Sequence, residues 1–148
     1  MSKPPAVSRE DTLRVRDTCL CLHAQRAARA LARRFDEALR PVGLTSGQFS
    51  LLMSLNRPHA PSMGSVADLL AIDRTTLTAN LKPLERRGLV HVAPDERDRR
   101  TRRLHITEEG RAVLAQAFPI WEECHARLDR LLAGSDPDRL RADLLALS

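Results

Sequence analysis

Apolar residues recur at helical spacing along most of the chain, and the longest such pattern lies near its start. One apolar face continues from about Glu10 to Leu39, which is about seven turns of an α-helix. Pro41 and Gly43 follow it, and both are typical of the end of a helix. The residues of this face are Leu13, Leu20, Ala24, Ala27, Leu31, Phe35 and Ala38.

Two shorter helices are predicted next. Thr45 and Gln48 have the spacing of a capping box, in which each side chain binds a free backbone amide of the first turn. The helix that they begin extends through Leu55. After a proline-containing loop at residues 57–61, a third helix is predicted from about residue 62 to residue 70.

A fourth helix and a pair of strands follow. Asp73 is a candidate N-cap, because its carboxylate can accept from the free amides of a first turn, and Gly88 ends the helix. Its apolar stripe is Leu77, Leu81 and Leu84. Apolar and polar residues alternate at positions 90–92 and again at 103–106, which predicts a β-hairpin. The segment 95–102 between the strands is too polar to be buried.

A second long helix is predicted over Thr107–Ala133, ended by Gly134. We expect a kink at Pro119, because proline lacks the amide that the helical ladder needs. Asp136 then caps a last helix in which Pro137 takes the first position. The pattern predicts a mainly α fold with a small β wing, namely a winged helix-turn-helix between long N- and C-terminal helices.

Length and composition limit the class of protein. A chain of 148 residues is one domain's worth, and such a chain buries roughly 68–70% of its unfolded surface. No apolar run is long enough for a transmembrane helix, and the first residues lack the apolar region of a signal peptide. We therefore expect residues 1–9 to form a flexible arm, and the protein to be cytoplasmic with no membrane partner. Three cysteines, an odd number, suit a reducing compartment.

Positive charge is concentrated in one part of the chain. The net charge is +5 and the isoelectric point is about 10.0. From Arg86 to Arg103, seven arginines stand against three acidic residues, a net charge of +4. Taken alone this is also the composition of a solvated basic face. Its place on a hairpin loop beside a helix-turn-helix favours binding of nucleic acid phosphates.

Three motifs, in this order, resemble the MarR family of bacterial winged-helix transcription regulators. They are Asp73-Arg74-Thr75-Thr76, then Leu84-Glu85-Arg86-Arg87-Gly88-Leu89-Val90, then Asp98-Arg99-Arg100 followed by Leu104-x-Ile106-Thr107-x-x-Gly110. The resemblance extends in element order from about Leu13 to the C-terminus. It implies a homodimer on a pseudo-palindromic double-stranded DNA operator. Residues 10–40 and 107–148 would form its helical dimerisation region, and residues 41–106 its DNA-binding lobe.

The fourth helix is the recognition helix that the resemblance implies. Donors on its first turn suit phosphates and base edges, and its polar face continues beyond that turn. The candidate DNA contacts on it are Arg74, Thr75, Thr76, Thr78, Asn80 and Lys82. Plain exposure is the other reading of Asn80. Pro83 removes one ladder bond inside this helix, so which residues reach bases is left open.

The hairpin loop supplies the other candidate DNA contacts. Arg100 aligns with the wing arginine that the family inserts into the minor groove, and Asp98 with the acid that steadies it. Arg97, Arg99 and Arg102 are expected to contact phosphates.

Family members often bind a small aromatic ligand beside the dimer helices, which suggests a repressor released by a ligand. Candidate lining residues, each of which also suits a core, are His23, Phe49, Met53, Phe118 and Trp121. One branch of the family senses organic hydroperoxides instead. Cys21 stands about where that branch has its reactive cysteine, and Cys124 where some members have the resolving one. That branch sets tyrosines beside its thiol, and this chain has none. The sequence therefore favours the other reading, in which Cys21 and Cys124 are small core residues.

Other classes are disfavoured. Cys19 and Cys21 lie two positions apart, about 200° around a helix, so they suit no shared metal. We expect no metal and no cofactor. We also expect no enzymatic activity, since the chain has no glycine-rich phosphate loop and no serine elbow. A winged helix used only for protein interaction is the alternative class, but its wing would be apolar or acidic rather than rich in arginine.

Overall fold

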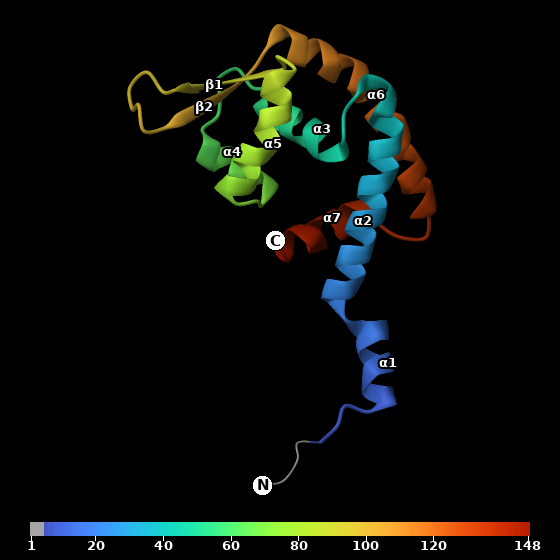
Figure 1. Cartoon of the computed structure of the whole chain (residues 1–148). Helices are drawn as coiled ribbons and strands as arrows, with labels where there is room; N and C mark the ends of the chain where they lie inside the picture. The colour runs from blue at the N-terminus through green and yellow to red at the C-terminus, as the bar shows by residue number, and fades with distance from the viewer. Residues whose placement is uncertain (1–4) are drawn as a thin grey trace.

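The computed structural model describes residues 5–148, and the predicted fold class is confirmed (Figure 1). Seven α-helices, one 3-10 turn and one two-stranded antiparallel sheet lie within this range. The elements are α1 (Arg9–Thr18), α2 (Leu20–Leu39), η1 (Arg40–Val42), α3 (Ser46–Leu55), α4 (Met63–Leu70), α5 (Arg74–Arg86), β1 (Val90–Pro94), β2 (Arg102–Ile106), α6 (Glu108–Leu131) and α7 (Pro137–Ala146). No helix in this part of the chain is both long and apolar enough to cross a bilayer.

The single long helix predicted near the start is wrong in one respect, because the structure divides it at Cys19. This residue has extended dihedrals, φ −69° and ψ 111°, so it ends α1 and caps α2. Its Sγ accepts from the amide of Leu22 at 3.5 Å. No residue of α1 is buried, so no packing within the chain holds α1 in line with α2.

The boundary predicted between the N-terminal arm and the first helix differs from the observed one. Residues 1–4 lie outside the described range, and residues 5–7 have no regular secondary structure. Ser8 and Asp11 form a capping box, in which the amide of Asp11 donates to Ser8 Oγ at 3.0 Å and the amide of Ser8 to Asp11 Oδ2 at 3.1 Å. Helix α1 therefore begins at Arg9, one residue before the predicted boundary.

The hydrophobic core lies mainly in the lobe formed by α3, α4, α5 and the sheet. The fully buried side chains are Leu39, Leu51, Leu52, Leu55, Val66, Leu77, Leu81, Leu84 and Leu104. Ser54 is the one buried polar residue of the described range, and its hydroxyl donates to the Leu51 carbonyl at 2.6 Å. The apolar stripe predicted for α5 therefore faces this core. The polar side of α5 faces outward.

The two strands pair in the register that alternation predicts, and β1 is two residues and β2 one residue longer than the predicted pattern. Val90 lies opposite Ile106, and Val92 opposite Leu104, with these side chains turned toward the core. His91 and His105 face each other on the other side of the hairpin. An isolated bridge joins Ser62 to Arg103, which ties β2 to the start of α4.

Helix α6 connects the wing with the N-terminal helices. Thr107 caps it, its Oγ1 accepting from the amide of Gly110 at 3.0 Å. The helix continues through Pro119 to Leu131, and Figure 1 shows that it changes direction along its length, as a helix with an internal proline is expected to. Asp136 caps α7 as predicted, accepting from the amides of residues 138 and 139.

Candidate nucleic-acid interface

Helix α5 begins with a charged cap. Asp73 Oδ1 accepts from the amide of Thr76 at 2.7 Å. That amide and the Thr76 hydroxyl lower the pKa of Asp73 below its ordinary value, so the carboxylate is charged at neutral pH. The turn before it is tight, since Ala71 adopts a left-handed φ of 53°. The first turn of α5 is thereby fixed relative to α4.

The predicted contact residues of α5 lie on its exposed face. Leu77, Leu81 and Leu84 are buried on the opposite face. The exposed residues are Arg74, Thr75, Thr76, Thr78, Asn80 and Lys82. The hydroxyl of Thr78 already donates to the Arg74 carbonyl at 2.8 Å, which leaves its lone pairs free to accept. Helix α5 thus presents hydrogen-bond donors from at least its first two turns on its solvent-exposed face.

Arg74 extends back over α4. A Cβ added at Gly64 would lie 2.9 Å from Arg74 Nη2, so the guanidinium occupies the space that a larger residue would fill. The first turn of α4, capped by Ser62, therefore carries the arginine of the next helix. Sequence reasoning missed the role of Gly64. Its only signal was a glycine inside a helix, where it is otherwise unfavourable.

Pro83 does not end α5, which continues to Arg86. Proline cannot donate to the carbonyl four residues earlier, which belongs to Ala79. That turn lines a hollow of about 160 Å³ between α3 and α5. Asn80 lies beside the same hollow, together with Gln48 of α3. Asn80 is therefore exposed at the junction of two helices rather than in the middle of the outer face.

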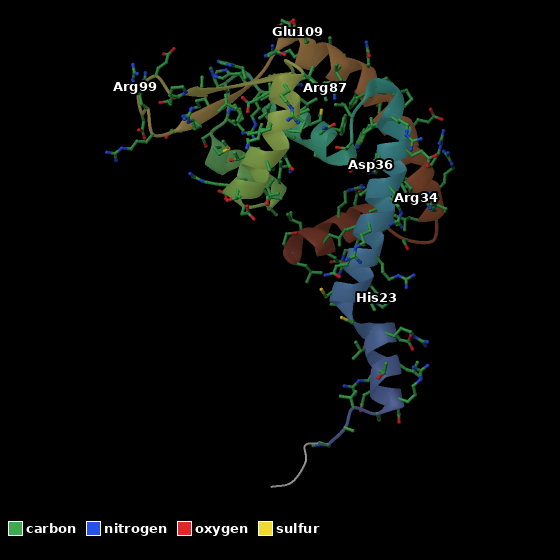
Figure 2. The ribbon with its side chains drawn as sticks, in the orientation of Figure 1. His23, Arg34, Asp36, Arg87, Arg99 and Glu109 are labelled. Atoms are coloured by element: carbon green, nitrogen blue, oxygen red, sulfur yellow. The ribbon has the colours of Figure 1, made fainter. Side chains whose placement is uncertain are left out.

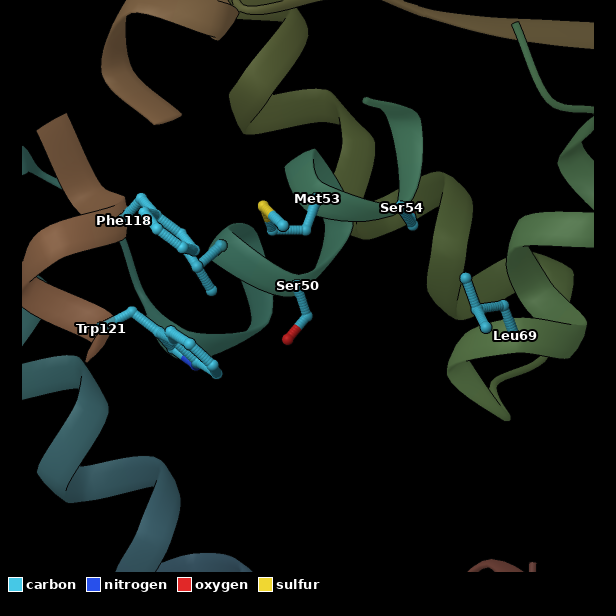
Figure 3. A pocket seen from close by; sticks show the side chains of 7 residues that line it. Ser50, Met53, Ser54, Leu69, Phe118 and Trp121 are labelled. Carbon is cyan, nitrogen blue, oxygen red and sulfur yellow. The ribbon is translucent and has the colours of Figure 1, made fainter. Parts of the chain in front are cut away.

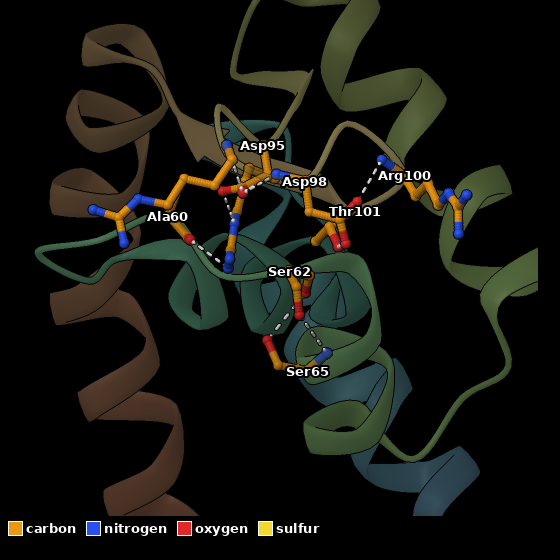
Figure 4. A network of polar contacts seen from close by, with 9 residues as sticks. Ala60, Ser62, Ser65, Asp95, Asp98, Arg100 and Thr101 are labelled. Atoms are coloured by element: carbon orange, nitrogen blue, oxygen red, sulfur yellow. Dashed lines mark hydrogen bonds and ion pairs between the residues drawn. The ribbon is translucent and has the colours of Figure 1, made fainter.

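The loop between the strands is held by its own carboxylates (Figure 4). Asp95 Oδ2 accepts from the amides of Arg97 at 3.1 Å and Asp98 at 2.9 Å. Asp98 in turn accepts from the amide of Arg100 at 3.1 Å and from the hydroxyl of Thr101 at 3.2 Å. These bonds order the backbone without using any guanidinium of the loop.

Arg103 anchors this loop to the rest of the lobe, a role that the sequence reading missed. Its Nε donates to Asp95 Oδ1 at 3.0 Å, and its Nη1 donates to the Ala60 carbonyl at 3.5 Å. The amide of Asp98 and then the Arg103 guanidinium lower the pKa of Asp95. The sequence did offer one indication of this contact: Arg103 occupies an outward-facing strand position, and Asp95 lies at the other end of the loop.

The four loop arginines, Arg97, Arg99, Arg100 and Arg102, are exposed. Within residues 5–148 none of their guanidinium groups forms an ion pair. Asp98 steadies Arg100 through the backbone amide, and Figure 4 shows the Arg100 side chain extending away from the loop. Unpaired exposed guanidinium groups on an ordered loop suit contact with phosphates or with a narrow minor groove.

A separate apolar hollow lies between α3 and α6. It has a volume of about 360 Å³ and is lined by Phe49, Ser50, Met53, Ser54, Leu69, Phe118 and Trp121 (Figure 3). Trp121 stacks with Phe49 at 6.2 Å between ring centroids and with Phe118 at 5.9 Å. Four of the five predicted pocket residues therefore meet here.

His23 does not meet them. It lies near the start of α2, away from the lobe (Figure 2), and its Nδ1 is 2.7 Å from the Cys19 carbonyl oxygen. His23 belongs to the first turn of α2, and no residue of α2 lines the hollow. The histidine beside Trp121 is instead His125, at 5.0 Å between ring centroids.

The predicted redox cysteines have different surroundings. Cys21 is exposed, and its Sγ accepts from Gln25 Nε2 at 3.3 Å. Cys124 is buried on α6 beside a hollow lined also by Arg34 and Arg127. Nowhere in residues 5–148 do three histidine, cysteine or acidic residues gather as a metal site would require.

The sequence and the fold of this chain are similar to those of known transcription regulators. The MarR family model matches residues 44–101. The DNA complex of the Mycobacterium tuberculosis transcriptional regulator MosR superposes with a TM-score of 0.80 and 39% identity, covering 88% of this chain and 93% of that one. The transcriptional activatory protein BadR of Rhodopseudomonas palustris is 42% identical over 51% of this chain and 45% of its own length. The transcriptional repressor NicR of Pseudomonas putida is 38% identical over 62% of this chain and 56% of its own.

The chain thus spans about half the length of the curated relatives it matches, and nearly all of the MosR chain. These relatives are transcription regulators rather than enzymes. On the sequence match and on the shared fold, the chain belongs to the MarR family of DNA-binding transcription regulators.

Proposed function

We propose that the protein is a homodimeric regulator that binds a pseudo-palindromic DNA operator and is released by a small aromatic ligand. The observation that carries the proposal is the pairing of an exposed α5 face with an ordered loop of four unpaired arginines. A regulator of this kind works in the cytoplasm, where it meets the chromosome.

The two elements take different parts of the DNA in this proposal. The first turn of α5 enters the major groove, where Arg74, Thr75 and Thr76 meet base edges and phosphates. Arg100 enters the adjacent minor groove. The neighbouring phosphates are contacted by Arg97, Arg99 and Arg102.

The homodimer is supported by apolar side chains that the single chain leaves uncovered. No residue of α1 or α7 is buried. Leu20 is 71% exposed, Leu144 47% and Leu145 75%. Exposed leucines at this density mark an interaction surface. We assign residues 10–40 and 107–148 to dimerisation and residues 41–106 to DNA binding. A two-fold axis would set the two α5 helices about one DNA turn apart, ~34 Å.

The ligand site that we propose is the hollow between α3 and α6. Its stacked aromatic rings suit a flat apolar molecule, and Ser50 is a polar residue among those that line it. Because α3 belongs to the DNA-binding lobe and α6 to the dimerisation region, a ligand there touches both. We propose that the protein represses transcription, as the name of NicR says of that relative. Because BadR is named an activator, a promoter assay must decide whether this protein represses or activates.

Two alternative functions are also to be tested, a thiol-based sensor and a protein-interaction module. Oxidation of Cys21 would release DNA without any ligand, although its thiol is bonded, among residues 5–148, to the neutral Gln25 amide alone. A protein-interaction module would not need four unpaired arginines on an ordered loop.

Selection of bound sequences from random duplex DNA, followed by light scattering, tests the proposal. We expect an inverted repeat, a dimer at micromolar concentration, and an affinity that falls steeply with salt as counterions are released. A monomer, or an affinity that is flat between low and moderate salt, would refute it.

A further inference from the structure

The C-terminal end of α5 is attached to two other parts of the molecule. On one side, the hydroxyl of Thr107 donates to the Gly88 carbonyl at 2.7 Å and its amide to the Leu89 carbonyl at 3.1 Å. On the other side, Arg87 Nη1 donates to the Gly43 carbonyl at 2.6 Å. This second bond joins residues 44 positions apart. It links the recognition helix to the corner where α2 turns into α3.

That corner is itself rigid. Gly43 has a left-handed φ of 70°, and its amide donates to the Arg40 carbonyl at 2.9 Å. Asp36 of α2 accepts from the amide of Ser46, the first residue of α3, at 2.6 Å. Arg87 therefore binds a fixed point at the end of the long N-terminal helix.

The Arg87 guanidinium also fills the space over Gly43. A Cβ there would lie 3.2 Å from Arg87 Nη2, a tight contact, so the glycine lets the guanidinium lie against the backbone. Within residues 5–148, Arg87 forms no ion pair, although it is exposed. Among the described residues, the Gly43 carbonyl is the one polar group that the Arg87 side chain binds. Figure 2 shows Arg87 at the upper end of α5 and Asp36 on α2.

We propose that Arg87 is a positioning residue that sets the angle of α5 on the α2–α3 corner, and so sets the half-site spacing that the dimer accepts. This inference rests on the proposed dimeric DNA binding. The buried Leu77, Leu81 and Leu84 hold α5 on the core, and the Arg87 bond, at the end remote from Asp73, limits the tilt of the helix that this packing leaves. When the two α5 helices of a dimer are held at fixed angles, they fit one spacing between the DNA half-sites. When their angles can vary, they fit several spacings.

The test compares Arg87→Ala with Arg86→Ala. Both remove one exposed arginine from the end of α5, and Arg86 makes no side-chain hydrogen bond in the described range. Each protein is titrated on the best selected duplex and on duplexes with one or two base pairs inserted between, or deleted from, the half-sites. Salt dependence and melting temperature are measured alongside.

We expect wild type and Arg86→Ala to lose more than about tenfold in affinity on two-base-pair insertion, because the helices then face the wrong part of the groove. Arg87→Ala should lose less than about threefold relative to its own best duplex. Arg87→Lys keeps a charged donor but loses the guanidinium plane over Gly43, so it should restore only part of the spacing preference. If Arg87→Ala fails to fold, the same comparison is made between Arg87→Gln and Arg87→Lys.

An Arg87→Ala spacing profile identical to that of Arg86→Ala would overturn the inference. A salt slope lower in Arg87→Ala than in Arg86→Ala, with an unchanged profile, would make Arg87 a phosphate contact and would overturn it too. Failure of the wild-type protein to select any inverted repeat would refute the proposed function instead, so the two failures are distinguishable.

Discussion

Arg103 and Asp95 close the base of the wing loop with a bond of 3.0 Å from Nε to Oδ1. Their side chains are 37% and 22% exposed, so the pair is shielded from solvent more than the other ion pairs of the chain. Because the same guanidinium also reaches the Ala60 carbonyl, the loop, the sheet and the segment before α4 share one anchor. The loop arginines are thus presented from an ordered backbone.

Replacing Arg103 with alanine should raise the pKa of Asp95 toward its ordinary value, but not fully, because the amide of Asp98 still stabilises the carboxylate. DNA affinity should fall by roughly three- to tenfold, since the loop must be ordered at the moment of binding. Carboxyl NMR titration and operator binding measure both effects. Glu96→Gln, a neighbouring acid without such a bond, is the control. An unchanged pKa of Asp95 would contradict the anchor.

The lowered pKa of Asp95 determines the pH range in which this carboxylate stabilises the folded state. The pKa of Asp95 is lower in the folded state than in the unfolded state, so its contribution to stability is complete above the unfolded value of about 3.9. It is lost as the pH falls through the folded value. Between pH 5 and 8 this carboxylate stays charged, and its titration should not alter DNA binding there.

Local signals were enough to predict α5 and the sheet. Asp73 caps the helix as its carboxylate allows, and Gly88 adopts a left-handed φ of 70°. The amides of Gly88 and Leu89 bind the carbonyls of residues 85 and 84, which is the helix ending that such a glycine favours. Each of these signals lies within a few residues of its effect.

The errors concern features that no local pattern specifies. The apolar spacing of the N-terminal helix continues in phase across Cys19, so the break between α1 and α2 was invisible. Arg87 and Gly43 lie 44 residues apart, and no local sequence pattern around either residue predicts their contact. His23 shared a predicted pocket with Trp121 only because both align with family positions.

Arg100→Ala should weaken operator binding by ~1–3 kcal/mol if its guanidinium enters the minor groove. The side chain is exposed and unpaired, so stability should change by less than about 0.5 kcal/mol. Melting and operator affinity are measured together. Arg97→Ala is the matched control, and as a phosphate contact it should chiefly reduce the salt slope, by about 1. Full affinity in Arg100→Ala would show that the wing lies elsewhere on the DNA.

Arg74→Ala and Thr76→Ala should change the preference among bases more than the salt slope, because both residues occupy the first turn of α5 after Asp73. Each variant is titrated on the best duplex and on single-base variants of it. If both α5 variants keep the wild-type mismatch profile, α5 does not read the bases.

A small aromatic effector should change the fluorescence of Trp121, the single tryptophan, because its ring lines the hollow between α3 and α6. The effector should also lower DNA affinity, and by linkage DNA must lower effector affinity by the same factor, typically about 5- to 150-fold. Fluorescence titration with and without operator measures this coupling. Phe49→Ala should weaken effector binding. A fluorescence change with no reciprocal effect of DNA would separate this hollow from regulation.

Oxidation should leave operator binding intact. In the described part of the chain, the neutral amide of Gln25 is the one polar group bonded to the Cys21 thiol. The sequence has no tyrosine, and Cys124 is buried. A thiol is a strong nucleophile only as the thiolate, which nearby positive charge favours and a neutral amide favours much less. An organic hydroperoxide is added, then operator affinity is measured and a non-reducing gel is run. Binding that is promptly lost, restored by reductant and insensitive to peroxide in Cys21→Ser would make the protein a thiol sensor. A crosslink that also disappears in Cys124→Ser would identify Cys124 as the resolving partner.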